Sequence, residues 1–246
     1  WSHCGTCKMH YVGEAKLRLA RVLWSELVTC PEGDPQRLHA ASNLTSTLSS
    51  LGRHVEAAAL VRETLAVRKR CLGPEHPNTL ASLNILACTM CARGKYAEAA
   101  SLDRETLAMR RQVLGKEHAG TLASANNLAN TLRVQGRHAE AATLHNETLA
   151  AKQHVLGMEH PDTLVSASNL AFTLYAQGLH KEAATLDRET LAIRKRVLGT
   201  QHPDTLASAN NLANTLRVQG QLEEAAALLR ETLEAKRRVL GAEHTN

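Results

Sequence analysis

Apolar residues recur along this chain at intervals of three and four residues, in segments that end at glycines. In the segment 121–136, a helical wheel places Leu122, Ala125, Leu128, Ala129 and Leu132 on one side, and polar residues occupy the other. This periodicity is typical of an amphipathic α-helix that buries one face. The pattern returns along the whole chain and predicts an all-α fold.

The helical segments repeat with a period of 42 residues. Three residue series keep this spacing: Gly52, Gly94, Gly136, Gly178 and Gly220; Gly73, Gly115, Gly157, Gly199 and Gly241; and His76, His118, His160, His202 and His244. A fixed period of this size predicts a solenoid of stacked repeats, each burying its apolar faces against its neighbours. Residues 121–136 and 205–220 are identical, which indicates that a two-repeat block was duplicated.

Each period contains two predicted helices. Residues 1–13 are a non-repeating lead-in, 14–35 form a degenerate capping helix and loop, and 36–246 hold five helix pairs, truncated at the C-terminus. The first helices are predicted over 36–51, 77–93, 119–135, 161–177 and 203–219, and the second over 54–72, 96–114, 138–156, 180–198 and 222–240. We expect both ends of the chain to have been cut from something longer.

Local signals mark the helix ends. Pro77, Pro161 and Pro203 stand at first helical positions, where a missing N–H has no cost. A histidine precedes each of them at the cap position, and a glycine ends each helix, where a residue of positive φ is favoured. The spacing of equivalent histidines, set by two helices per repeat, is too wide for a shared zinc ion. We therefore expect helix caps and no metal site among these histidines.

The resemblance to a known family rests on residues of one repeat: Asn127-Leu128-Ala129, Gly136, Glu140-Ala141-Ala142, Thr148-Leu149 and Val155-Leu156-Gly157. They resemble tetratricopeptide repeats, in particular the 42-residue form of kinesin light chains and nephrocystin-3-like proteins. Small packing residues of the family match Ala129, Gly136 and Ala141, whereas Thr148 stands where alanine is usual. The resemblance implies a right-handed superhelical solenoid of antiparallel helix pairs.

The polar side of each first helix is rich in asparagine, a weak helix former. An amide offers donors and an acceptor, which suits contact with an extended peptide backbone. The resemblance assigns this side to the concave groove that holds peptides in the family. The candidate groove residues are Asn43, Asn84, Asn126, Asn127, Asn130, Arg133, Asn169, Phe172, Tyr175, Asn210, Asn211, Asn214 and Arg217. The alternative is that the asparagines bond to neighbouring helices and fix the repeat spacing.

Phe172 and Tyr175 lie one turn apart on this side, in a chain with only 2% aromatic residues. They are candidates for a pocket that takes an apolar ligand side chain, or for packing between adjacent first helices. Arg133 and Arg217 stand at equivalent positions and favour an acidic or carboxylate-bearing peptide. Arg194, on a second helix, is expected to face away from the groove.

The net charge of +5 is spread over short basic runs near the ends of the second helices, for example Arg68-Lys69-Arg70 and Arg194-Lys195-Arg196. Cations there complement the helix dipole and are predicted to be solvated. A nucleic-acid surface would need a contiguous basic stripe with stacking aromatics. We therefore expect no nucleic-acid partner.

Six cysteines in a chain of this length imply no disulfide framework. No apolar run approaches the roughly 18 residues of a membrane span and no signal peptide is visible, so we expect a cytoplasmic protein without membrane insertion. Cys88 and Cys91 fall inside a helix, where a redox motif is not expected. Cys4 and Cys7, beside His3 and His10, resemble the closing half of a RING-like zinc finger or are an incidental pair.

The sequence predicts a protein–protein interaction scaffold or adaptor that binds a partner peptide in its groove, with no cofactor. It predicts no enzyme, because no catalytic triad, carboxylate pair or phosphate-binding loop stands apart from the repeat. Two alternatives stay open. One is a substrate-recognition or regulatory module of a larger enzyme, such as a RING-type ubiquitin ligase. The other is a purely structural spacer.

Overall fold

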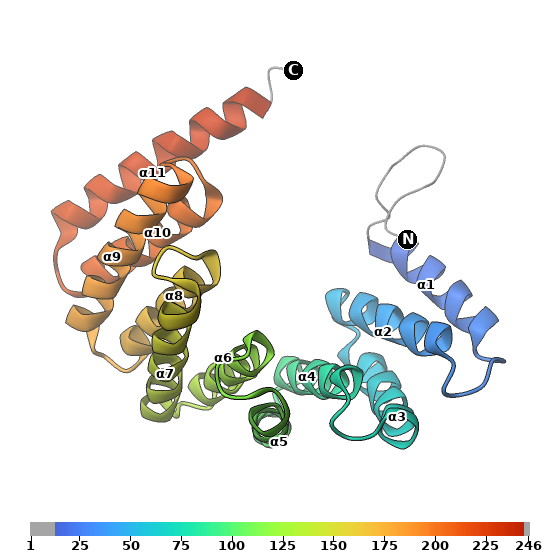
Figure 1. Ribbon diagram of the computed structural model, residues 1–246. Helices are drawn as coiled ribbons and strands as arrows, with labels where there is room; N and C mark the ends of the chain where they lie inside the picture. The colour runs from blue at the N-terminus through green and yellow to red at the C-terminus, as the bar shows by residue number, and fades with distance from the viewer. Residues whose placement is uncertain (1–12, 244–246) are drawn as a thin grey trace. The chain divides into compact units, whose positions relative to one another are not determined.

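The computed structural model describes residues 13–243, which form eleven α-helices and no strand. Within each of two parts of the chain, consecutive helices pack against each other in antiparallel fashion, so the predicted all-α array of helix pairs is confirmed (Figure 1). The chain divides into two compact units, residues 1–116 and residues 117–246. Each unit is described by itself.

The first unit contains α1 (Gly13–Leu27), α2 (Pro35–Ser50), α3 (His54–Leu72), α4 (Pro77–Ala92) and α5 (Tyr96–Leu114). Its core consists of two clusters of buried aliphatic side chains. One joins α1, α2 and α3 through Leu17, Leu44, Leu48 and Ala57, and the other joins α3, α4 and α5 through Val61, Leu65, Leu83, Met90 and Ala99. Small alanines at the helix contacts let the helices approach closely.

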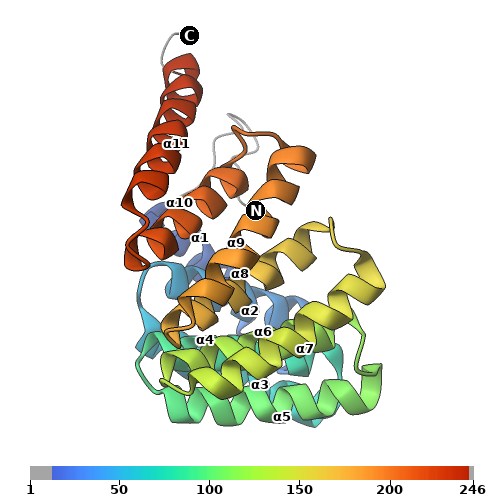
Figure 2. The same ribbon diagram turned by 90° about the vertical axis from the view of Figure 1, so that its left-hand side faces the viewer.

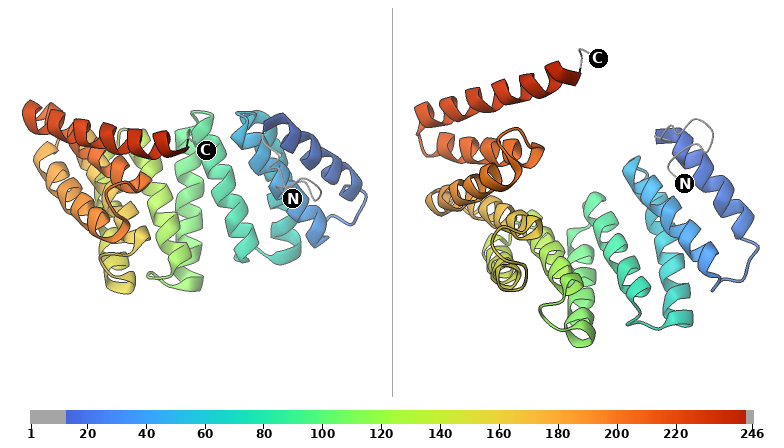
Figure 3. Two further views of the ribbon diagram at one scale, coloured as in Figure 1. Left: turned by 90° about the horizontal axis from the view of Figure 1, so that it is seen from above. Right: turned by 45° about the horizontal axis from the view of Figure 1, so that its top comes forward.

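The second unit contains α6 (Ala119–Val134), α7 (His138–Leu156), α8 (Pro161–Ala176), α9 (His180–Leu198), α10 (Pro203–Val218) and α11 (Leu222–Glu243). Each helix packs against the next, as the views in Figure 2 and Figure 3 show. The first helix α8 also contacts the first helices α6 and α10 on either side of it. This contact places the polar faces of the three first helices next to each other.

Histidines cap the first helices as predicted. The Nδ1 atoms of His118, His160 and His202 accept hydrogen bonds of 3.0–3.2 Å from the backbone N–H two residues later, which satisfies one of the unpaired donors of a helix start. His76 does the same in the first unit, and Asp34 takes this role for α2.

Glycines of positive φ follow the helices, with φ of 90° at Gly73 and 74° at Gly52. One prediction is wrong: α11 continues through Gly241 to Glu243. A glycine permits a chain reversal but does not force one, since within a helix it costs only about 1 kcal/mol relative to alanine.

The prediction that the basic runs are solvated is wrong for Arg68 and Arg194. Arg68 is 7% exposed and Arg194 is 6% exposed. The Arg194 guanidinium donates to Ser208 Oγ at 2.5 Å and to the Asp204 carbonyl at 3.2 Å. Arg68 makes the same contacts with Ser82 and Asn78 and also donates to the Leu38 carbonyl of α2 at 3.1 Å. This position faces the start of the next first helix, so the arginine joins successive helices.

The following residues of these two runs, Lys69, Arg70 and Arg196, are exposed, as predicted, whereas Lys195 is half-buried, and all four form ion pairs. Lys69 pairs with Glu105 at 3.2 Å and Lys195 pairs with Glu231 at 2.9 Å, in both cases 36 residues further along the chain. Arg188 pairs with Glu224 at the same separation. These pairs connect second helices of successive repeats, and each contributes little because most of the partners are exposed.

Candidate peptide-binding surface

The polar side of the first helices in residues 117–246 is partly open to solvent. In α6 the residues of the apolar stripe are buried, whereas Asn127, Asn130 and Arg133 are half-buried. In α10 the equivalent Asn211, Asn214 and Arg217 are exposed. We call this side of α6, α8 and α10 the first-helix face. It holds eleven of the residues predicted for the groove: Asn126, Asn127, Asn130, Arg133, Asn169, Phe172, Tyr175, Asn210, Asn211, Asn214 and Arg217.

Some of the predicted asparagines bond to neighbouring helices. Asn169 Nδ2 of α8 donates to Asn126 Oδ1 of α6 at 2.9 Å. In the first unit, the Asn84 amide oxygen, turned toward α5, accepts from the Arg110 guanidinium at 3.2 Å. These amides connect neighbouring helices, as the alternative interpretation of the asparagines expects. The more exposed amides of Asn211 and Asn214 make no such side-chain bond within residues 13–243.

The first unit offers less of this surface. Asn43 is exposed on α2, beside a cavity of about 420 Å³ that α1 and α2 line mostly with apolar side chains. On α4 the positions equivalent to Asn127, Asn130 and Arg133 hold Ile85, Cys88 and Cys91. Both cysteines lie on the helix as predicted. The helix α4 therefore lacks the combination of amides, aromatics and arginines that α8 and α10 present.

The two aromatic residues of α8 have different neighbours. The Arg133 guanidinium of α6 lies over the Phe172 ring at 4.5 Å, yet Phe172 remains 51% exposed. Tyr175 is half-buried, and its ring meets that of His180 edge-on at 5.1 Å. Phe172 thus packs against an adjacent first helix, and it still offers half of its surface to solvent. Burying a ring of this kind is a large apolar contribution to binding.

A cavity of about 270 Å³ opens between α8, α9 and α10. Five of the predicted residues line it, namely Phe172, Tyr175, Asn211, Asn214 and Arg217, together with Ala171, Asp187 and Thr215. Two aromatic rings, two amides and a guanidinium therefore surround one hollow. Its size suits one ligand side chain and lies just below the range of sites for whole small molecules.

Asp187 of α9 was not predicted as a site residue. It is 4% exposed, lines the cavity, and accepts a 3.3 Å hydrogen bond from the Thr215 hydroxyl. Burial raises its pKa to about 6, while the Thr215 bond and the charge of Arg194 act in the opposite direction. The sequence does contain a signal for this residue. The equivalent positions one and two periods earlier hold His145 and Asp103, which are also titratable and lie on the buried side of their helices. A titratable residue on an apolar stripe needs an explanation.

The arginines of the first-helix face have no acidic partner within the described residues. Arg133 is half-buried, and burial lowers its pKa. Neither Arg133 nor Arg217 forms a side-chain hydrogen bond or ion pair within residues 13–243. Beside Arg133 lies His145, which is fully buried without a hydrogen-bond partner at either nitrogen. Burial and the nearby Arg133 lower the pKa of His145 to about 4, so it is neutral at physiological pH.

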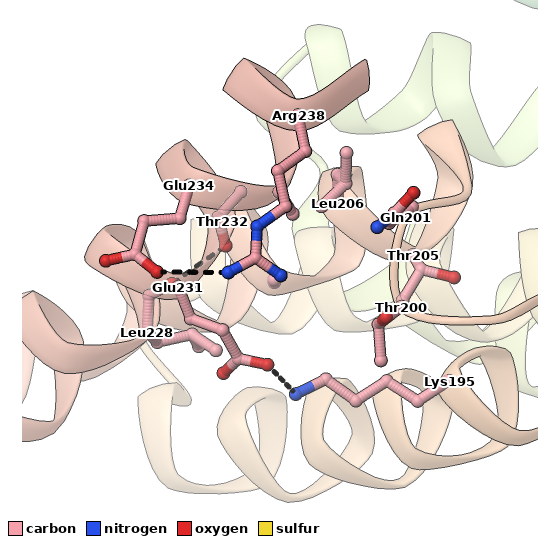
Figure 4. A pocket seen from close by; sticks show the side chains of 12 residues that line it. Lys195, Thr200, Gln201, Thr205, Leu206, Leu228, Glu231, Thr232, Glu234 and Arg238 are labelled. Carbon is pink, nitrogen blue, oxygen red and sulfur yellow. Dashed lines mark hydrogen bonds and ion pairs between the residues drawn. The ribbon is translucent and has the colours of Figure 1, made fainter. Parts of the chain in front are cut away.

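A second hollow, of about 150 Å³, lies between α9, the start of α10 and α11 (Figure 4). Its charged groups are already matched: Lys195 pairs with Glu231 at 2.9 Å, and Arg238 lies 3.9 Å from Glu234. No candidate site residue lines it. We assign no binding role to this hollow.

The predictions about zinc concern Cys4, Cys7, His3 and His10, which lie outside the described residues. Within residues 13–243, no group of three or more histidine, cysteine or acidic side chains is arranged to hold a metal ion. In the same range, no helix is both long and apolar enough to cross a membrane.

The tetratricopeptide repeat family matches residues 36–112, 89–154 and 162–238 of this chain. Among solved structures, a kinesin light chain-like protein of Podosopora anserina with nearly identical TPR-like repeats is 32% identical in one structure, with a TM-score of 0.76. That match covers 83% of this chain and 96% of the other. A second structure of that protein is 31% identical, with a TM-score of 0.75, and the match covers 86% of this chain and 99% of the other.

The structure of BtubC (BKLC) from P. vanneervenii shares the fold with a TM-score of 0.78 at 20% identity, covering 93% of this chain and 92% of the other. No curated protein sequence matches the chain.

Proposed function

This chain belongs to the tetratricopeptide repeat family, whose members generally serve as protein-interaction scaffolds, and we propose that its first-helix face binds an extended segment of a partner protein. The observation that carries the proposal is the cavity between α8 and α10. It gathers two aromatic rings, two amides and a guanidinium on one open surface. A purely structural spacer has no use for such a hollow.

The arginines define one feature of the ligand. Arg133 and Arg217 stand at equivalent positions on α6 and α10, and neither has an acidic partner within the described residues. By contrast, Arg188 and Arg196 of α9 pair with Glu224 and Glu159. A guanidinium without a counter-ion suits a ligand carboxylate, which it can hold through two parallel hydrogen bonds. The ligand segment therefore carries an acidic residue.

The amides and rings define the remaining contacts. Asn211 and Asn214 of α10 are exposed and offer donors and acceptors to a ligand backbone. Phe172, half-exposed on α8, offers an apolar surface to a ligand side chain. We propose no catalytic role, because the polar groups of this surface suit binding, and the kinesin light chain-like relatives are repeat proteins of the same kind.

The test is a selection from a random-sequence peptide library, followed by titration of the selected peptides against variants. Losing one charge-assisted contact costs on the order of 1.5–3 kcal/mol, or roughly 10- to 150-fold in affinity. Arg217→Ala and Arg133→Ala should each weaken binding by a factor in this range and reduce its dependence on salt.

The matched control is Arg188→Ala, an exposed arginine of α9 that pairs with Glu224. Arg194 of the same helix is not suitable as a control, because it is buried and its guanidinium joins two helices. If Arg188→Ala weakens binding as much as Arg217→Ala, or if the selected peptides lack acidic residues, the assignment of the acidic contact to this face is wrong.

A further inference from the structure

The cavity between α8, α9 and α10 has a buried carboxylate in its wall, that of Asp187. The cation that acts on it from within the protein, Arg194, is hydrogen-bonded to Ser208 and to the Asp204 carbonyl instead. Asp187 accepts one bond, from the neutral Thr215 hydroxyl at 3.3 Å, and forms no ion pair within residues 13–243. A buried carboxylate with a single neutral donor is poorly compensated for the loss of water. The cavity therefore favours an occupant that brings a positive charge.

We propose that this cavity binds a basic side chain of the partner segment, a lysine or an arginine, with its cationic group at Asp187. The inference rests on the proposed function, since it assumes that a peptide lies on the first-helix face. It adds a second charged feature to the ligand, opposite in sign to the acidic residue that Arg133 and Arg217 would bind.

The walls of the cavity suit the rest of such a side chain. Phe172 and Tyr175 supply apolar surface for a methylene stem, and a ring face attracts a cation. Phe172 already shows this preference within the protein, because the Arg133 guanidinium lies 4.5 Å from its ring. The Asn211 and Asn214 amides line the same cavity, and each has an oxygen that can accept from an ammonium or guanidinium group.

An apolar side chain fits this lining less well. It would cover Asp187 and remove it further from water without supplying a counter-charge, which is costly for a carboxylate. An acidic side chain would meet a like charge. Arg217 also lines the cavity but forms no ion pair with Asp187 within the described residues, and Arg194 acts on the carboxylate through its charge without forming an ion pair with it.

The experiment uses peptides selected against the whole chain from a random-sequence library. In each selected peptide, the basic residue is replaced by norleucine, which keeps the apolar stem and removes the charge. Both forms are titrated against the wild type and Asp187→Asn. Asparagine has the same shape and still accepts from Thr215, so this variant should fold with a melting temperature no lower than that of the wild type.

The norleucine replacement should weaken binding to the wild type by about 10- to 100-fold, and binding to Asp187→Asn by less than about threefold. Asp103→Asn is the matched control. It alters the buried aspartate at the equivalent position of α5, in the other unit, and should retain the full preference for the basic residue.

The outcomes separate the two proposals. Two results overturn the present inference and leave the proposed function standing. In the first, the selected peptides need Arg217 but share no basic residue. In the second, the norleucine replacement weakens binding equally for the wild type and for Asp187→Asn. Peptides whose binding is insensitive to both Arg217→Ala and Asn214→Ala overturn the proposed function, and this inference falls with it.

Discussion

Single residues at one position of the second helix show how this repeat tolerates polar groups in its core. The position holds Val61, Asp103, His145 and Asp187 in successive repeats, all of them buried. His145 and Asp187 are both driven toward their neutral forms by burial, which lowers the pKa of the histidine to about 4 and raises that of the aspartate to about 6. Their effects on stability therefore have opposite signs with pH.

For His145, the unfolded chain takes up a proton near pH 6.5 and the folded chain only near pH 4. The unfolded state thus binds more protons in this window, so the histidine lowers stability as pH falls from about 6.5 to about 4, by about 2–3 kcal/mol in all. For Asp187 the folded state binds more protons between about pH 3.8 and about pH 6. Its contribution rises as pH falls and masks that of His145 in the wild type.

We predict that His145→Val removes the histidine effect, because valine occupies this position at Val61 without strain. The free energy of unfolding is measured with urea at about pH 7 and about pH 4.5. Its change between the two pH values should be more favourable for the variant than for the wild type by about 2–3 kcal/mol. The exposed His154 of the same helix provides the control, and His154→Ala should follow the wild-type curve. Parallel curves for His145→Val and the wild type would contradict the buried, neutral histidine.

At the scale of helices, much of the structure could be predicted from sequence because local chemistry fixes it. From the capping histidines, the prolines and the glycines, most helix ends were predicted within one or two residues of those observed. The wheel of one first helix also identified which side buries leucine and which side carries the candidate site.

Contacts between elements were harder to predict. A wheel shows that Arg194 and Asp187 lie on a helix, but not which neighbouring helix covers them. Both residues turn toward the next repeat, where Arg194 reaches Ser208 and Asp187 reaches Thr215. The cavity was therefore only half predicted: its aromatic, amide and guanidinium lining was expected, whereas its carboxylate was missed.

The arginine contact between helices yields a reciprocal prediction. Lys152 stands at the position of Arg194 and reaches only the Asp162 carbonyl at 3.1 Å, so that the buried Ser166 hydroxyl has no partner. Lys152→Arg should supply the missing bond and raise the free energy of unfolding by about 1 kcal/mol. Arg194→Lys should lower it by a similar amount. Thermal and urea unfolding of the two variants measure this, and a Lys152→Arg protein less stable than the wild type would show that the contact does not transfer between repeats.

At the scale of the whole molecule, the two units share the same repeat fold but differ in the residues that their first helices expose. Residues 117–246 combine exposed amides, free arginines and a ring-lined cavity on α6, α8 and α10, whereas α4 of the first unit carries Ile85, Cys88 and Cys91 at the matching positions. A repeat array can vary such surface residues without changing its fold, because each repeat is held by its neighbours. We therefore place the binding of a partner segment in the second unit.

The most direct test of this account compares two substitutions of the same chemistry on opposite sides of that unit. Asn214 lines the cavity on α10, and Asn146 is an exposed asparagine of the second helix α7. The affinity of a library-selected peptide is measured by calorimetry for Asn214→Ala, Asn146→Ala and the wild type. We predict that Asn214→Ala weakens binding by about 3- to 30-fold, as expected for loss of one hydrogen bond and its packing, and that Asn146→Ala leaves it unchanged. Equal effects of the two substitutions, or a loss confined to Asn146→Ala, would contradict the claim that the first-helix face binds the peptide.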